Sequence, residues 1–166
     1  MAGMEVLGRN ANIIPVAKAA PFKMRSASSA MIVCTIPSVG SGDTFTINEQ
    51  TSFGGGTTAI PVIKNIYWTA ALNGTAAWNK ITYSQTNLTG IFLTAGGPLS
   101  AITLGTAGTT GLLTALVAVF HVLTSELSDP NNYLEVAVTG SNGLVQVILS
   151  DLVVQRAPAN LEILSA

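Results

Sequence analysis

From Met31 onward, short apolar runs alternate with clusters of Gly, Ser, Asn, Asp and Pro, such as Gly40-Ser41-Gly42-Asp43. Apolar runs rich in β-branched residues and bounded by such clusters are typical of strands. The strands predicted in this way are residues 31–37, 44–48, 60–71, 80–85, 90–94, 100–104, 113–124, 133–139 and 144–155. Several short strands at nearly regular spacing predict an all-β protein, with an antiparallel β-sandwich or jelly-roll-like domain.

The run 113–127 allows two interpretations. A helix would bring its larger apolar residues onto one side, at Leu113, Leu116, Val117, Phe120, Leu123 and Leu127. The β-branched residues Val117, Val119 and Val122 favour a strand instead, because they pack well on a pleated surface. We predict a strand and keep the helix as the alternative.

The last two predicted strands suggest a hairpin. Asn142-Gly143 is the dipeptide preferred in a two-residue type I′ turn. Such a turn would pair Val138 with Val147 and would leave one face apolar and the other largely polar. Beyond Leu149 the apolar positions shift from odd to even numbers, which predicts a β-bulge near Ser150-Asp151.

A turn is also expected before this hairpin. Asp129-Pro130-Asn131-Asn132 places Pro at the second position of a type I turn. The turn would return strand 113–124 into strand 133–139. Together with the hairpin, this predicts three antiparallel strands that follow one another in sequence.

Residues 1–30 show neither strand nor helix periodicity, and Pro15 and Pro21 interrupt them. They nevertheless contain many apolar side chains, which suit a segment lying on a neighbouring surface better than a solvated linker. We therefore predict an extended N-terminal arm over residues 1–30 and a single β-rich domain over residues 31–166. Charged residues and prolines, among them Arg9, Pro15 and Lys18, stand where a signal peptide would need its apolar stretch, so we predict no signal peptide.

Composition narrows the function. The chain of 166 residues has 7 Lys and Arg, 8 Asp and Glu, and a charged fraction of 9%, whereas soluble domains average about 25%. This deficit excludes charged disordered proteins and nucleic-acid binders that rely on bulk electrostatics. Residues 81–125 contain no Asp, Glu, Lys or Arg, but their apolar part, residues 112–123, is shorter than the ~20 residues of a spanning helix. A buried strand or helix with both faces apolar explains that run.

Few residues could support a reaction. Cys34 lies in an apolar run and is expected to be a buried free thiol. His121 is the sole histidine, lies in an apolar run and has no evident partner for acid–base chemistry. The carboxylates are scattered, and a calcium loop at Glu126, Asp129, Asn131 and Asn132 lacks the usual acidic ladder, which favours ordinary turn chemistry. We expect no catalytic residue, no metal and no cofactor.

A neutral β domain rich in Gly, Thr, Ala and Asn, with the arm from Met1 to Ala30 and the ending Val153-Val154-Gln155-Arg156-Ala157-Pro158, resembles the decoration or cement proteins of tailed bacteriophage capsids. The resemblance implies a virion structural protein, made in the host cytoplasm, that stabilises an assembled shell. Its implied partners are the major capsid protein and copies of itself, expected as a trimer, with neither membrane nor nucleic acid.

The arm would anchor such a subunit on the shell through apolar side chains and through cations that pair with coat carboxylates. The residues expected to bind are Arg9, Ile13, Ile14, Val16, Lys18, Phe22, Lys23, Met24 and Arg25. Two other classes stay open. A carbohydrate-binding or adhesin module of a phage fibre or tail would use Trp68, Trp78 and Tyr83, and a hydrolase would use His121. Another virion coat subunit is a further alternative.

Overall fold

The computed structural model describes residues 11–16, 20–24, 27–38, 42–61, 63, 65–69, 78–82, 100–105 and 116–152. Within them the chain forms strands and one short 3₁₀ turn, Thr124–Glu126. The strands are β1 (Ala11–Val16), β2 (Phe22–Lys23), β3 (Ala27–Thr35), β4 (Asp43–Gln50), β5 (Thr58–Ala59), β6 (Asn65–Thr69), β7 (Asn79–Thr82), β8 (Ala101–Leu104), β9 (Val117–Leu123), β10 (Tyr133–Thr139) and β11 (Leu144–Leu152).

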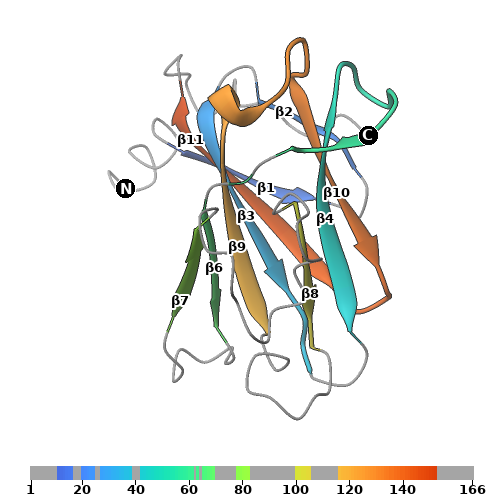
Figure 1. Ribbon diagram of the computed structural model, residues 1–166, viewed down its shortest axis with the longest axis vertical. Helices are drawn as coiled ribbons and strands as arrows, with labels where there is room; N and C mark the ends of the chain where they lie inside the picture. The colour runs from blue at the N-terminus through green and yellow to red at the C-terminus, as the bar shows by residue number, and fades with distance from the viewer. Residues whose placement is uncertain are drawn as a thin grey trace, which may run out of the picture.

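The strands form two antiparallel sheets. Sheet A has the order β1-β11-β3-β9-β6-β7, and sheet B has the order β2-β10-β4-β5, with β8 also paired to β4. Figure 1 shows β7, β6, β9 and β3 side by side in one layer, with β4 and β10 in the other. The fold is therefore an all-β antiparallel sandwich, as the sequence predicts.

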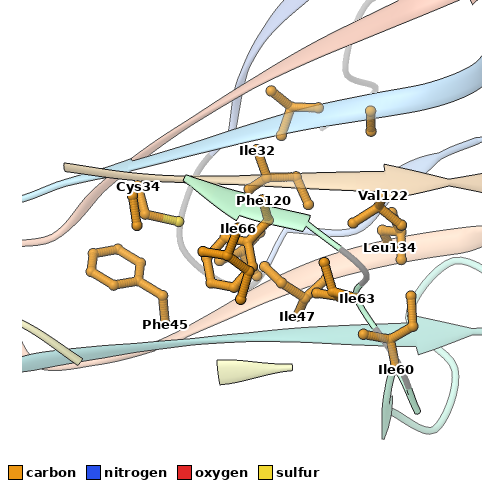
Figure 2. Packing of buried hydrophobic residues seen from close by; sticks show 14 of the residues in the cluster. Ile32, Cys34, Phe45, Ile47, Ile60, Ile63, Ile66, Phe120, Val122 and Leu134 are labelled. Atoms are coloured by element: carbon orange, nitrogen blue, oxygen red, sulfur yellow. The ribbon is translucent and has the colours of Figure 1, made fainter. Parts of the chain in front are cut away.

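The core lies between the two sheets. Ile32 and Cys34 of β3 and Phe120 of β9 meet Phe45 and Ile47 of β4, and all five side chains are buried (Figure 2). Over residues 30–34 of β3, residues 43–49 of β4 and the whole of β9, the buried residues occupy alternate positions, because successive side chains of a strand point to opposite faces. This alternation fixes which residues remain on the outer face of each sheet.

Several predicted strands are confirmed. Strand 133–139 has its predicted bounds as β10, and β4, β8, β9 and β11 overlap their predicted ranges. Residues 117–123 form a strand rather than a helix, which settles the choice left open for that run. The predicted strand 90–94 lies outside the described residues.

The predicted C-terminal hairpin is wrong. β10 pairs with β2 and β4 in sheet B, whereas β11 pairs with β1 and β3 in sheet A. The type I′ turn is also absent, because Gly143 does not adopt the positive φ that this turn requires, whereas Gly140 does, at 119°. Residues 140–143 instead carry the chain from one sheet to the other. Because β9 lies in sheet A as well, the three strands in succession predicted for this region do not pair with one another.

The β-bulge predicted near Ser150-Asp151 is also wrong. β11 keeps one register against β3 from Leu144 opposite Thr35 to Leu152 opposite Ala27. The shift in apolar positions after Leu149 therefore has no counterpart in the pairing. The turn before β10 differs from the prediction as well, because the Asn131 N–H donates to the Ser128 carbonyl (2.7 Å) and places Pro130 third in the turn.

The segment predicted as an arm contributes strands to the sandwich. β1 pairs along its whole length with β11 at an edge of sheet A, β2 pairs with β10, and β3 begins at Ala27. Pro15 fits this position because an edge strand can dispense with one N–H donor. The boundary predicted at residues 30 and 31 therefore falls inside β3.

Candidate functional site

Sheet A has an outer surface that the core does not use. Along β9, Ala118, Phe120 and Val122 are buried, and the residues between them point away from the core. The same holds along β3, where Met31 and Val33 alternate with buried neighbours. Apart from His121, these outward residues of β3 and β9 are apolar, although the core lies on the other side of the sheet.

The strand register gathers these outward residues into rows. Met31 lies between Ile148 of β11 and His121 of β9, and Val33 lies opposite Val119, which lies opposite Tyr67 of β6. We call these positions the sheet A face. Its apolar members are Met31, Val33, Tyr67, Val117, Val119, Leu123, Leu144 and Ile148. Its polar members are Thr35, Asn65, His121, Gln146 and Ser150, and Ser29 and Thr69 share these rows but are buried.

The face is accessible and uncharged across its centre. Leu144 is 66% exposed and Met31 is 40% exposed, and the remaining apolar members are half-buried. The described cation nearest to this face is Lys80 on β7, whose ammonium lies 5.5 Å from the centre of the Tyr67 ring, and the Glu126 carboxylate accepts the Leu123 N–H at one end of β9. Lys80 occupies the last strand of the sheet, so that charge lies at the rim of the face.

Sheet B presents a different outer surface. Its outward positions on β4 are Thr44, Thr46 and Asn48, which pair with Thr139, Ala137 and Glu135 of β10, and the next residue in this row, Gln50, is buried opposite Tyr133. Polar groups there bond to one another, since the Thr44 and Thr103 hydroxyls lie 2.8 Å apart and Gln50 Nε2 donates to Glu135 Oε2. A polar outer face suits water, as is usual for one side of an antiparallel sheet. The apolar sheet A face is therefore not a requirement of the fold.

The residues predicted to bind through the arm fall into three groups. Phe22 and Met24 are buried in the core of their own domain, so the prediction that they anchor a partner is wrong. Ile13, Ile14 and Val16 lie in β1, whose backbone pairs with β11, and Lys23 places its ammonium 5.8 Å from the centre of the Tyr133 ring. Arg9, Lys18 and Arg25 lie outside the described residues.

The candidates for chemistry do not come together. Cys34 points into the core, where burial raises the pKa of its thiol and makes the reactive thiolate scarce. His121 lies on the opposite side of the sheet, with Met31 and Asn65 as its cross-strand neighbours. Trp68 is 8% exposed and belongs to the core, whereas Trp78 is 55% exposed, and Tyr83 lies outside the described residues. A stacking platform that uses both tryptophans is therefore not assembled.

Two carboxylates are buried and accept hydrogen bonds from backbone N–H groups. Asp43 Oδ2 accepts the N–H groups of Asn142 (2.9 Å) and Gly143 (2.6 Å), and Glu49 Oε2 accepts the Ser128 N–H (2.8 Å). Glu126, one of the possible calcium ligands, accepts the Leu123 N–H at 3.0 Å. Within the described part of the chain, no group of three or more His, Cys, Asp or Glu residues could hold a metal ion.

Comparison with family models, curated proteins and solved structures finds no match to this chain. Among the described residues, no helix is long and apolar enough to span a membrane. The function must therefore be inferred from the chain's own surfaces.

The sheet A face was missed by the sequence interpretation, although a signal for it was present. The runs Met31-Ile32-Val33-Cys34 and Val117–Leu123 are apolar at both odd and even positions, whereas a half-solvated strand alternates. For the run 112–123, burial on both faces is the explanation that the sequence favours. The structure shows that one face is buried and that the other lies at the surface.

Proposed function

We propose that this protein is a virion structural subunit that binds and stabilises an assembled capsid shell, as decoration proteins do. The observation that carries the proposal is the sheet A face, a nearly uncharged outer surface with eight apolar members on a domain with an independent core. Contiguous exposed apolar side chains on a protein surface mark interaction sites. Its proposed partners are the major capsid protein and copies of itself, with a trimer as the expected assembly.

Stabilisation would operate by mass action. A subunit that binds the assembled shell and not the free coat protein shifts the equilibrium toward assembly by an amount set by its concentration relative to its Kd. Such a role needs surface complementarity and no chemical step. Binding supported by Arg9, Lys18 and Arg25 would add pairs between these cations and coat carboxylates.

The test is co-sedimentation of the purified protein with empty shells of the virus that encodes it. The full chain should pellet with the shells and should raise the temperature at which they break. Deleting residues 1–10 removes only the chain before β1, so the variant keeps every described strand and should fold. It should bind the shells more weakly. If the full chain does not bind shells at saturating concentration, the proposed function is wrong.

A further inference from the structure

We infer that the sheet A face is a self-association surface, covered in the native assembly by a second copy of this chain. The inference rests on the proposed function only in so far as both require an assembled protein. It starts from the contrast between the two outer faces of the sandwich. Sheet B has threonines, amides and a bonded Glu135 outside, whereas sheet A has Met31, Val33 and Val119.

The size of the face is more than half of what a standard protein interface uses. The four strands that supply it, β11, β3, β9 and β6, at about 4.8 Å spacing with about 7 residues each at about 3.4 Å rise, give a sheet surface of roughly 460 Å². A standard specific interface buries about 800 Å² on each partner, so the face would form the apolar part of such an interface. Sheets that pack face to face lie about 10 Å apart, with their side chains interdigitated, which is how the two sheets of this domain already meet. A second apolar sheet could therefore cover the face completely.

The charge pattern favours a copy of the same chain over other partners. A nucleic acid or an anionic membrane would need cations across the face, and the described cation nearest to it, Lys80, lies on the edge strand. A second sheet A face is equally neutral, so no like charges oppose one another at the centre. It also carries the same mixture of medium-sized apolar side chains. The polar members near the centre, His121 and Asn65, have hydrogen-bonding groups that can meet their counterparts.

The strands themselves support this arrangement. Apart from His121, β9 is apolar on both faces, a pattern typical of strands covered on both sides. In the single chain, its inward residues Phe120 and Val122 are buried, but Val117 and Val119 remain accessible. Covering the outer face would give β3 and β9 the two-sided burial that their sequences indicate. Both a dimer with the faces opposed and a trimer around a threefold axis would achieve this.

Sedimentation velocity on the full chain at micromolar concentration tests the inference. The native protein should sediment as an oligomer. Met31→Lys places a charge at the centre of the face, at an exposed position that the fold tolerates, and should weaken association at least about tenfold. Val119→Lys, on the adjacent strand, should do the same. Thr46→Lys is the matched control, because it puts the same charge at an outward position of sheet B and should associate as the native chain does.

Testing the same variants for shell binding distinguishes self-association through the sheet A face from binding of the coat protein. Native oligomers that persist in both face variants would overturn the inference. A monomeric native chain would also overturn it. If Met31→Lys then also loses shell binding, the face belongs to the coat protein and the proposed function stands. If Met31→Lys instead lowers the unfolding midpoint of a monomer, the face is covered by the chain's own remaining residues. Self-association through the face without shell binding would leave the inference intact and refute the proposed function.

Discussion

Asp43 joins the loop between β10 and β11 to the start of β4. One oxygen of its buried carboxylate accepts hydrogen bonds from the backbone N–H groups of both Asn142 and Gly143. The loop fits closely around this side chain, since a Cβ on Gly140 would lie 2.0 Å from Asp43 Oδ1 and a Cβ on Gly143 would lie 2.5 Å from Phe45 Cζ. The Asn-Gly dipeptide therefore serves a crossing between sheets, in which small residues allow close packing against β4.

Replacing Asp43 should destabilise the domain more than replacing an exposed carboxylate. Asp43→Ala leaves two N–H donors without their acceptor, and we expect the free energy of unfolding to fall by about 2–3 kcal/mol in urea titration. Asp43→Asn retains one oxygen acceptor and should lose less. Asp129→Ala, at an exposed turn position, is the control and should change the stability by less than about 0.5 kcal/mol. Equal midpoints for Asp43→Ala and Asp129→Ala would show that the carboxylate does not hold the loop.

At the scale of elements, strand positions could be predicted from the sequence, but strand partners could not. β4 and β10 are local patterns of alternating side chains and turn residues, which a short stretch of sequence determines. The partner of β10 depends on the buried Asp43, which is about a hundred residues away in sequence, and no local pattern indicates that contact. The N-terminal strands were missed for a similar reason, since β2 has only two residues and gains its stability from Phe22 in the core.

The burial of Phe22 predicts that its side chain is needed for a stable fold. Phe22→Ala removes a ring from the core between the sheets and should lower the free energy of unfolding by about 3–4 kcal/mol. Lys23→Ala, at the next position, loses an ammonium–ring contact with Tyr133 and should cost at most about 1 kcal/mol. Thermal or urea unfolding of the two variants measures both effects. If Phe22→Ala proved as stable as Lys23→Ala, the fold would not depend on the Phe22 side chain. Residues 22–24 could then bind a partner, as the sequence predicts.

At the scale of the whole molecule, the shortage of charge is greater at the surface than the composition suggests. Two of the eight acidic residues, Asp43 and Glu49, are buried and bonded to backbone donors. The described charges that remain at the surface lie at the rim of sheet A, on sheet B or in the turn region, as Lys80, Lys23, Glu135, Glu126 and Asp129 do. A monomer with so few charges would tend to associate. We expect this association to occur through the sheet A face.

Salt should therefore affect the strengths of self-association and of shell binding differently. Self-association through the sheet A face buries apolar side chains, so raising NaCl to about 1 M, where the Debye length is about 3 Å, should leave its Kd within about twofold. Sodium sulfate should strengthen it, because excluded salts favour apolar burial. Shell binding that depends on Arg9, Lys18 and Arg25 should instead weaken as NaCl rises. Both can be measured by sedimentation in one salt series. A self-association that disappears at high NaCl would mean that ion pairs hold the copies together, and the apolar face would then need another occupant.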